Sequence, residues 1–527
     1  MEEYKVLITT SGVGSRLGEL TQYTNKGLVR IGKKPAISYI VENYPKDITI
    51  VVTLGYYGDQ VKDFLELAYP DRLFEFVKIE NYDGPGSSLV YSILQSEKNL
   101  QCPFIYHACD TLVFQPVPTP HCNWVGGFKK KDGASNFRTI VKTGDTFLKF
   151  NEKGVTGCDD IYIGLSGIKD YESFWENAWK VYKDSPLEKQ LSDCHVINNM
   201  SSSINKRSDF TCKDFETWMD IGNIDGLTTA RAVIDDKFDI LDKVDESIFI
   251  YDDYVIKFFY DKQIIKKRVL RGKYLGLSCP KIIDQRDNFY KYEYVKGDVF
   301  SKRITLSRFS QLLEWAREFL WKRMDFKGDF SKVCYDFYID KTVSRICKYF
   351  KETGQSADTV QKINGLIIPP IGDLMSRVDL NWLCASDPCT IHGDFILENI
   401  MYTEDGFKLI DWRQDFGGVL ECGDIYYDLA KLNHNLIFSH DIIYRDLFYV
   451  KEKSLTEIEC DILRSNLLCE CQNILFDFIE KNGYDLKKVK ILTPIIWLNM
   501  APLHSYPINR FLFYFGKYTL NKELQYV

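Results

Sequence analysis

Residues 4–16 read YKVLITTSGVGSR, a short apolar stretch that runs directly into a turn with two glycines. The apolar run at 6–8 is typical of a strand buried on both faces of a parallel sheet. The glycines let the backbone come close to a phosphate chain with its amides pointing inward, and Arg16 adds a fork of donors for phosphate oxygens. The same pattern also occurs as a purely structural turn between a strand and a helix, so the rest of the chain must decide between the two.

The remainder of residues 1–232 alternates short apolar runs with helical patterns. Strand-like runs occur at 48–53 and 103–108, and apolar residues at helical spacing occur at 37–44 and 61–65. This alternation predicts an α/β fold in which a doubly wound, mainly parallel sheet has helices on both faces.

The pattern changes in the second part of the chain, residues 233–527. Short strands are expected at 249–251, 255–259 and 290–295, and again near Thr390, Ile400 and Leu409. Helical patterns extend from about 305 to 383, with a break at Pro369-Pro370, and continue after the last strand to the end. A small β lobe followed by a helical lobe, an α+β arrangement, is therefore predicted. The boundary is placed within 230–240, where neither proline nor glycine marks it.

Composition supports a folded chain of more than one domain. The sequence has 527 residues, of which 45% are hydrophobic and 27% charged, and its net charge is −7. No run of five or six basic residues is present, which disfavours nucleic acid as a partner. The 15 scattered cysteines and the absence of a secretory signal predict a cytoplasmic protein, and no apolar run is long enough to predict membrane insertion.

Two further short motifs follow the glycine turn. Lys26 comes ten residues after Arg16, and the stretch 84–89 reads GPGSSL just before a helical pattern. By itself Lys26 is an ordinary surface lysine, and 84–89 is an ordinary turn with a helix cap. Near a phosphate-binding turn, the lysine could bind phosphate and the glycine turn could press its amides against a base.

Two aspartates are candidates for a metal site. Asp110 ends the apolar run at 104–109, and Asp220 lies within the stretch Trp218-Met219-Asp220-Ile221-Gly222. Ligands bind at the carboxyl ends of parallel strands, where carboxylates suit a hard cation such as Mg²⁺. A helix cap is the alternative interpretation of Asp110.

Together, these motifs resemble the sugar-1-phosphate nucleotidyltransferases, over roughly residues 4–228. The resemblance implies a Rossmann-like fold, and it implies catalytic roles for Arg16 and Lys26 and Mg²⁺ ligands at Asp110 and Asp220. It also implies the following nucleotide-binding residues: Gly12, Gly14, Ser15, Gly84, Gly86 and Ser87. Glu152 and Lys153 match a pair that contacts sugar and phosphate in relatives. The chain departs from the family at Asn25, where proline is usual.

The second part contains the stretch His392-Gly393-Asp394-Phe395-Ile396-Leu397-Glu398-Asn399, followed by Ile410-Asp411-Trp412. An aspartate, an asparagine five residues later and a second aspartate after a hairpin form the arrangement found in kinases. Asp394 is expected to accept the proton of the substrate hydroxyl. Asn399 and Asp411 are expected to hold Mg²⁺.

This stretch resembles the aminoglycoside and choline kinases, over roughly residues 240–527. The resemblance implies that Lys257 binds phosphate and that the strand with Glu293 and Val295 contacts adenine. Two features depart from the group: no glycine-rich loop precedes Lys257, and 263–278 contains no acid to pair with it. Asp424 and Asp428 follow a pattern common in the group, and they are interpreted as bracing the scaffold or facing the substrate, with bracing favoured.

These observations predict a bifunctional enzyme with Mg²⁺ as cofactor. A kinase phosphorylates a small sugar or alcohol with ATP, and a nucleotidyltransferase joins the phosphomonoester to an NTP, which suggests NDP-sugar synthesis for cell-surface glycans. The stretch around Asp220 favours the sugar branch. The alternatives are a choline kinase joined to a phosphocholine cytidylyltransferase, and a protein in which one domain is a catalytically dead ligand sensor. The NTP, the acceptor and the oligomeric state stay open.

Overall fold

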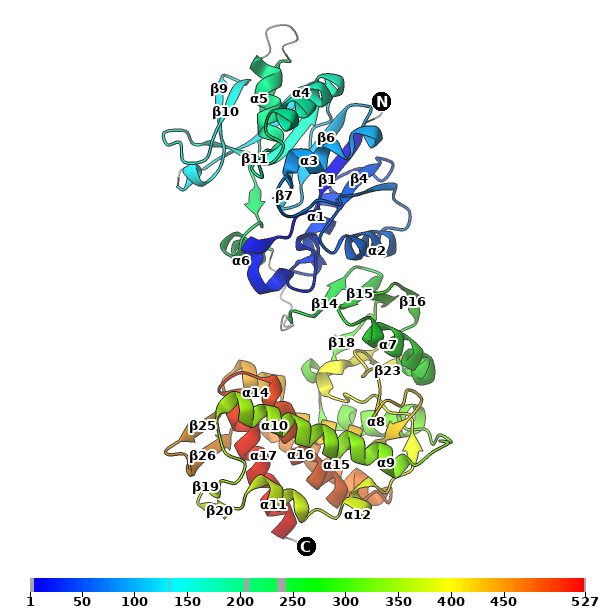
Figure 1. Ribbon diagram of the computed structural model, residues 1–527. Helices are drawn as coiled ribbons and strands as arrows, with labels where there is room; N and C mark the ends of the chain where they lie inside the picture. Colours follow the sequence, from blue (N-terminus) through cyan, green and yellow to red (C-terminus); the bar gives the residue numbers. More distant parts are fainter. Residues whose placement is uncertain (1–3, 131, 203–207, 235–242, 526–527) are drawn as a thin grey trace. The chain divides into compact units, whose positions relative to one another are not determined.

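The computed structural model describes residues 4–130, 132–202, 208–234 and 243–525. The chain divides into two compact units, each built from two stretches of sequence: Met1–Ile265 with Ile283–Tyr294, and Lys266–Ile282 with Val295–Val527 (Figure 1). Part of the predicted boundary region, 230–240, lies outside the described residues. The division into functional domains 1–232 and 233–527 stays a prediction.

The first unit is built on a nine-stranded sheet with the strand order β5-β4-β1-β6-β11-β8-β12-β10-β9. Its strands are β1 Lys5–Thr9, β4 Ile50–Leu54, β5 Phe74–Lys78, β6 Phe104–Ala108, β8 Asn123–Lys129, β9 Thr139–Thr143, β10 Thr146–Asn151, β11 Asp160–Ile168 and β12 Phe210–Asp214. The four strands β5-β4-β1-β6 are parallel, as the alternating pattern predicts. Beyond them β12 is parallel to β8, whereas β11, β10 and β9 run antiparallel to their neighbours. The α/β class is confirmed, with an antiparallel extension that the sequence pattern did not indicate.

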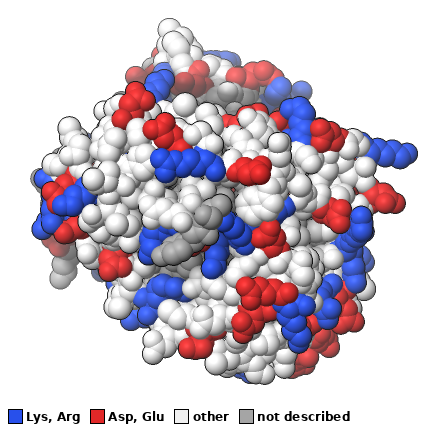
Figure 2. All heavy atoms as spheres, turned by 90° about the horizontal axis from the view of Figure 1, so that it is seen from below, with Lys and Arg blue, Asp and Glu red and all other residues white. Residues whose placement is uncertain are grey.

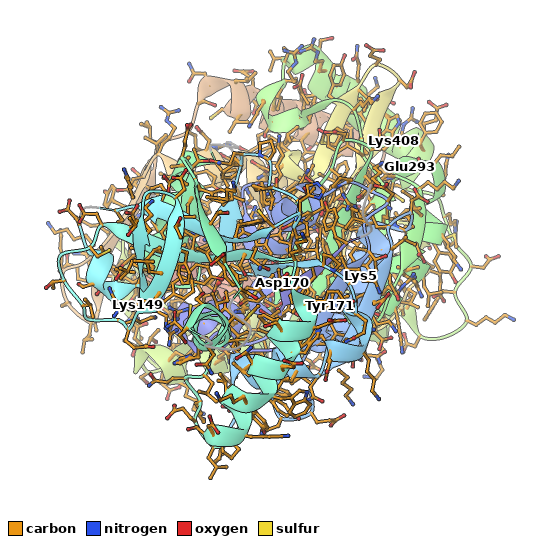
Figure 3. All side chains as sticks on the ribbon, turned by 90° about the horizontal axis from the view of Figure 1, so that it is seen from above. Lys5, Lys149, Asp170, Tyr171, Glu293 and Lys408 are labelled. Carbon is orange, nitrogen blue, oxygen red and sulfur yellow. The ribbon has the colours of Figure 1, made fainter. Side chains whose placement is uncertain are left out.

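Helices cover both faces of this sheet (Figure 1). They are α1 Ala36–Glu42, α2 Gly58–Ala68, α3 Leu89–Leu94, α4 Tyr171–Asp184, α5 Asp193–Ser202 and α6 Ile224–Val233. Alternate residues of β1 enter different cores: Val6 and Ile8 pack in one cluster and Leu7 in the other. Outside the cores, Lys149 points from β10 to solvent while Phe147 and Phe150 of that strand are buried (Figure 3).

A second, four-stranded sheet belongs to the same unit, with the order β14-β15-β17-β16. Its strands are β14 Glu246–Ile250, β15 Tyr254–Phe259, β16 Ile282–Gln285 and β17 Phe289–Glu293. The strands predicted at 249–251, 255–259 and 290–295 therefore form, although each begins or ends a few residues away from its predicted limits.

The four-stranded sheet packs against α2. The ring centroid of Phe64 lies 5.3 Å from that of Phe249 and 5.9 Å from that of Phe289. At the end of α2, Tyr254 Oη donates to the Ala68 carbonyl at 2.7 Å and Lys291 Nζ donates to the Leu67 carbonyl at 3.1 Å. One hydrophobic cluster therefore continues from the nine-stranded sheet through α2 into the four-stranded sheet.

The second unit is mainly helical. Its principal helices are α7 Lys262–Leu275, which begins in the first unit, α8 Leu306–Trp315, α9 Phe330–Tyr335, α10 Lys341–Thr353, α11 Ile371–Ser376, α12 Leu380–Cys384, α13 Ile425–Ile437, α14 His440–Tyr444, α15 Asn466–Lys481, α16 Leu486–Met500 and α17 Ile508–Gln525. Its small sheets are formed by β18 Asp298–Val299, β22 Ile400–Thr403 and β23 Gly406–Leu409; by β19 Gln361–Ile363, β20 Leu366–Ile368, β25 Phe448–Glu452 and β26 Glu457–Ile462; and by β21 Pro388–Cys389 with β24 Gly423–Asp424.

The helical pattern expected from 305 to 383 is wrong in one part, because β19 and β20 form a hairpin there. The turn between them is Asn364-Gly365, and both residues have positive φ, 50° and 83°. An Asn-Gly pair between apolar residues favours this tight hairpin turn, so the sequence held a signal that the helical periodicity concealed. None of the helices in the described residues is long and apolar enough to cross a membrane.

Replacing Phe64 with alanine should destabilise the first unit by about 3–5 kcal/mol, because the change removes a buried ring and leaves a cavity between two sheets. Urea unfolding followed by circular dichroism would measure the loss. The matched control is Phe114→Ala, because the Phe114 side chain is 46% exposed. Equal destabilisation by the two substitutions would contradict the shared core.

Candidate active sites

A cleft of about 660 Å³ opens in the first unit beyond the carboxyl ends of β1 and β6. Predicted site residues that line it are Gly12, Arg16, Lys26, Ser87, Asp110, Lys153 and Asp220. Gly14, Ser15, Gly84, Gly86 and Glu152 are not part of this lining. The cleft therefore collects both predicted catalytic residues and both predicted metal ligands of the first unit.

The glycine turn lets the Lys26 side chain pack closely against the backbone at Gly14. Gly14 has a φ of 69°, and a Cβ atom at this position would lie 3.0 Å from Cβ of Lys26. A larger residue at Gly14 would therefore be strained and would push against Lys26. At Gly12, a Cβ atom would meet nothing within 4 Å, so this side of the turn is open toward the cleft.

Asn25, which replaces the proline usual in the family, fixes the local backbone through side-chain hydrogen bonds. Its side-chain amide donates to the Thr10 carbonyl at 2.9 Å and to the Tyr56 carbonyl at 2.6 Å. Its side-chain oxygen accepts from the Gly27 amide at 2.8 Å. These bonds fix the segment that carries Lys26 against the loop after β1, a task that proline would perform through its fixed φ.

Asp110 lies beside both cationic residues. Lys26 Nζ and Arg16 Nη2 are each 3.7 Å from Asp110 Oδ2. Burial acts to raise the pKa of Asp110, but the two cations outweigh it and hold the pKa below its ordinary value. Burial likewise acts to lower the pKa of Lys26, whereas Cys109 and Asp110 raise it above its ordinary value. At neutral pH Asp110 and Lys26 are therefore both charged.

The pairing of two short strands brings Asp220 to Asp110. In the two-stranded sheet of β7 Thr111–Val113 and β13 Trp218–Asp220, Asp220 pairs with Thr111, the neighbour of Asp110. A Cβ atom at Gly222 would lie 2.9 Å from Asp110 Oδ2 and 3.1 Å from Asp220 Oδ1. Both carboxylates therefore lie next to Gly222 and close to each other. Burial raises the pKa of Asp220, and the charge of Asp110 adds to this effect, although the Gly222 amide opposes it.

This pair of carboxylates fits a hard divalent cation. Two oxygens that repel each other across a short gap are stabilised when a cation lies between them, and Mg²⁺ is commonly held by one or two carboxylates together with substrate phosphates. No group of three or more His, Cys, Asp and Glu side chains suited to a metal occurs in the described residues. The candidate is thus a two-carboxylate site that substrate phosphates would complete.

The turn at 84–89 has the backbone that its glycines predict. Gly84 and Gly86 have φ of 94° and 79°, and a Cβ atom at Gly86 would lie 3.2 Å from the Pro186 carbonyl. Ser88 caps α3 by accepting from the Tyr91 amide at 3.1 Å. The cap and the cleft-lining turn are therefore both present, since Ser87 and Ser88 line the cleft.

The predicted Glu152-Lys153 pair separates. Lys153 lines the cleft, but the Glu152 carboxylate lies 3.0 Å from Arg138 Nη2 and 3.3 Å from His195 Nε2. Glu152 therefore contacts Arg138 and His195, and its role in substrate binding stays a prediction.

Sequence reasoning missed a group at the far end of the cleft. Asp193, at the start of α5, accepts a hydrogen bond from Tyr162 Oη and is 3% exposed. Burial raises the pKa of Asp193, and the Tyr162 hydroxyl opposes this effect. Tyr106, Phe137 and further aromatic side chains also line the cleft. No short motif marks these residues, because they come together only when α5 folds against β11.

In the second unit, Asp394 and Asn399 are in direct contact. Asn399 Nδ2 donates to Oδ2 and to the carbonyl of Asp394, both at 3.0 Å. His392 is fully buried, and its Nε2 lies 2.9 Å from the Ile410 carbonyl, which joins this loop to the segment before Asp411. The three predicted residues of the kinase motif are thus held on two linked segments.

Asp424 and Asp428 brace this scaffold, which is the favoured of the two interpretations. Asp428 accepts from the backbone amides of His392 at 2.8 Å and Gly393 at 2.7 Å. Burial raises the pKa of Asp428 to about 6, although those two amides oppose it. Asp424 accepts from Tyr338 Oη at 2.7 Å and caps α13 through the Tyr426 amide. Neither carboxylate is exposed.

Asp394 has a cationic partner that the sequence did not reveal. Lys431 Nζ of α13 lies 2.7 Å from Asp394 Oδ1. Burial acts to raise the pKa of Asp394, but Lys431 outweighs it, and the pKa is lowered to about 2. The carboxylate is therefore ionised at neutral pH and can accept a hydrogen bond from a hydroxyl.

Asp411 forms an ion pair with Arg268 of α7. The sequence of α7 itself contains no acidic residue that could pair with Lys257. Lys257 lies on β15 and is buried, and Glu293 lies exposed at the end of β17 (Figure 3). These two belong to the first unit, whereas Val295 begins the second stretch of the second unit. The roles predicted for the three in ATP binding stay predictions.

Comparisons with known proteins found similarities to both parts of the chain. A sequence model of the phosphotransferase enzyme family matches residues 336–444, which include Asp394, Asn399 and Asp411. A choline-phosphate cytidylyltransferase of Streptococcus pneumoniae (strain ATCC BAA-255 / R6) is 31% identical over 113 residues, which is 21% of this chain and 46% of that protein. The match thus spans just under half the length of this relative.

Three solved structures are similar to the chain over less than half of its length. A UDP-glucose pyrophosphorylase complexed with UDP-glucose has 17% identity and a TM-score of 0.37, over 44% of this chain and 98% of that one. A CTP:phosphocholine cytidylyltransferase from Streptococcus pneumoniae has 20% identity and a TM-score of 0.36, over 44% and 99%. An inositol-1-phosphate CTP transferase from T. maritima has 15% identity and a TM-score of 0.35, over 46% and 99%.

Part of the chain is therefore similar in sequence to a nucleotidyltransferase, and residues 336–444 match the model of the phosphotransferase enzyme family. Both resemblances drawn from the sequence motifs are confirmed at this level.

Proposed function

We propose that the chain is a bifunctional enzyme, a small-molecule kinase joined to a nucleotidyltransferase that uses the kinase product. The observation that carries the proposal is the convergence of Arg16, Lys26, Asp110 and Asp220 on one cleft, together with the Asp394-Asn399 contact in the second unit. The proposed substrates are ATP, a second NTP and a small sugar or alcohol. The proposed product is an NDP-conjugate suited to cell-surface glycan synthesis.

In the transferase, a phosphomonoester oxygen forms a bond to the α-phosphorus of the NTP, and the bond to pyrophosphate breaks. The nucleophile is already an anion, so positioning and charge neutralisation can supply most of the catalysis. Arg16 and Lys26 would bind phosphate oxygens. Asp110 and Asp220 would hold Mg²⁺, which neutralises charge on the phosphates.

In the kinase, Asp394 would orient the acceptor hydroxyl and receive its proton as the hydroxyl oxygen bonds to the γ-phosphorus of ATP and ADP leaves. The low pKa of Asp394 keeps the carboxylate ionised before the acceptor binds, so that it can accept a hydrogen bond from the hydroxyl. Asn399 and Asp411 would hold Mg²⁺. Asp411 would then exchange its Arg268 partner for the metal.

A second candidate is a transferase that makes CDP-choline. The name of the 31% identical relative favours it, since that protein is a choline-phosphate cytidylyltransferase. Aromatic side chains and the buried Asp193 in the cleft also suit a cationic substituent. Turnover of CTP with phosphocholine, compared with sugar 1-phosphates and the other NTPs, separates the two candidates.

Asp110→Asn and Asp220→Asn should each reduce NTP-dependent pyrophosphate release by at least about 100-fold, because each removes a carboxylate from the proposed metal site. ADP formation by the kinase should be unchanged. Coupled assays for pyrophosphate and for ADP measure both activities on one preparation. Asp145→Asn, in the exposed turn between β9 and β10, is the matched control. Near-normal pyrophosphate release by both variants would overturn the metal assignment.

Asp394→Ala should lower acceptor phosphorylation by about 10²- to 10⁴-fold, because it removes the group that orients the hydroxyl and takes its proton. Nucleotidyl transfer from a supplied phosphomonoester should persist. The control Asp405→Ala changes an exposed aspartate in the turn between β22 and β23. If Asp394→Ala phosphorylates the acceptor at the wild-type rate, Asp394 is not the catalytic aspartate.

A further inference from the structure

Basic side chains from three segments gather beside Asp394 in the second unit. They are Lys341 and Arg345 of α10, Arg413 in the segment after β23, and Lys431 of α13. Lys431 Nζ is 2.7 Å from Asp394 Oδ1. Arg413 lies against the neighbouring Gly393, where a Cβ atom would be 2.8 Å from Cβ of Arg413. We call these four residues the cationic cluster.

The ring of Phe337 contacts two members of the cationic cluster, Lys341 and Arg413. Lys341 Nζ lies 4.3 Å from the centroid of this ring, and the Arg413 guanidinium carbon lies 5.0 Å from it. A ring face attracts cations through its quadrupole, but by much less than a carboxylate would. Two basic side chains therefore lie on one aromatic ring that compensates their positive charge only weakly.

Acidic partners are few around the cluster. Among the described residues, neither Lys341 nor Arg413 has a carboxylate oxygen within 4.0 Å, and Arg413 Nε is buried without a hydrogen-bond partner. Arg345 donates to the side chain and backbone carbonyls of Asn499, which are neutral. Asp415 attracts Lys341, but its own ion pair at 2.7 Å is with Lys267.

The electrostatics agree with this geometry. Burial lowers the pKa of Lys341 to about 6, with repulsion from Arg413, Arg345 and Lys431 adding to the effect and Asp415 opposing it. Burial, again helped by Arg413, also lowers the pKa of Arg345. On the face drawn in Figure 2, described acidic and basic side chains lie interspersed. A partly buried excess of positive charge is costly unless an anion binds there.

The phosphates of ATP are one anion that the cluster could bind, but the aspartates of the metal-binding segment have basic partners from another helix. Asp411 is paired with Arg268 and Asp415 with Lys267, both from α7. The cluster instead contacts Asp394 through Lys431, and Lys341 and Arg413 contact Phe337. Asp394 is the residue that would orient the acceptor hydroxyl, so the contact with Lys431 brings the cluster next to the expected position of the acceptor.

We propose that the kinase acceptor is a hydroxy acid, whose carboxylate binds Lys341 and Arg413 while its hydroxyl reaches Asp394. This inference rests on the proposed kinase function and narrows its substrate class. The hydroxyl oxygen bonds to the γ-phosphorus, the bond to the bridging oxygen of ADP breaks, and the hydroxyl proton passes to Asp394. The product carries both a carboxylate and a phosphomonoester. Cationic acceptors such as choline are disfavoured by the same charges.

The test compares acceptors that differ only in charge, with the full chain and ATP. Glycerate should be used with at least about tenfold higher kcat/KM than glycerol, and gluconate than glucose, because each ion pair in a partly buried site contributes about 1.4 kcal/mol or more. Choline and glycerol phosphate test the cationic and phosphate alternatives. Preference for a neutral acceptor or for choline would overturn the proposal of an anionic acceptor. Preference for glycerol phosphate would show that the bound anion is a phosphate and would overturn the proposal of a hydroxy acid.

Substitution of Lys341 locates the effect. Lys341→Met should raise the KM for the carboxylate acceptor about tenfold and leave the KM for ATP and the use of the neutral acceptor unchanged. Lys351→Met, exposed on the same helix, is the matched control. Arg413→Met provides a second variant if Lys341→Met fails to fold. A higher KM for ATP with an unchanged acceptor KM would assign the cluster to the nucleotide and overturn the proposal.

Calorimetry separates this inference from the proposed function. Glycerate binding at pH 7 should be accompanied by net proton uptake, because a nearby carboxylate raises the pKa of Lys341 above the value of about 6 that it has without a bound anion. Titrations in two buffers of different ionisation enthalpy measure this uptake, which Lys341→Met should abolish. Glycerate binding that depends on Lys341, with no phosphorylation of any acceptor tested, would refute the kinase function but support the anion site. Absence of glycerate binding, with phosphorylation of another acceptor, would refute the anion site but support the kinase function.

Discussion

The packing of Phe64 between two sheets is the contact on which the first unit depends. Its buried ring touches Phe249 and Phe289 of the four-stranded sheet, while α2 lies on β4 of the nine-stranded sheet. The strand that carries Lys257, the residue predicted to bind ATP, therefore belongs to a sheet that shares a hydrophobic core with the nine-stranded sheet of the first unit. A chain cut between residues 232 and 233 would expose that core, since burying aromatic rings supplies much of the stability of such an interface.

Both sites contain a buried carboxylate that neighbouring cationic side chains keep ionised. Asp110 is flanked by Lys26 and Arg16, and Asp394 is paired with Lys431. In each case burial alone would favour the neutral acid, and the cation reverses that preference. Charged groups that are fixed before the substrate binds need little reorganisation during phosphoryl or nucleotidyl transfer.

The sequence predicted the parts of the molecule whose chemistry is local. The apolar run at 6–8 predicted a buried strand, and the spacing of Asp394 and Asn399 predicted that they belong to one site, where the structure shows them in contact. Residues joined only by tertiary folding were not predictable: Lys431 reaches Asp394 from α13, and Asp193 reaches the cleft from α5. The hairpin at Asn364-Gly365 is different, because its turn signal was present and the helical periodicity around it was given more weight.

The central claim is that the two reactions are consecutive and share one phosphomonoester. Joining both domains on one chain fixes their stoichiometry and raises their local concentration, but it does not by itself make the product of one the substrate of the other. The direct measurement gives the full chain ATP, a second NTP, Mg²⁺ and its best unphosphorylated acceptor, and follows the products by mass spectrometry. The account predicts that a nucleoside-diphosphate conjugate of that acceptor accumulates together with ADP and pyrophosphate. Accumulation of the phosphorylated acceptor alone, with a transferase that turns over only phosphates the kinase cannot make, would contradict it.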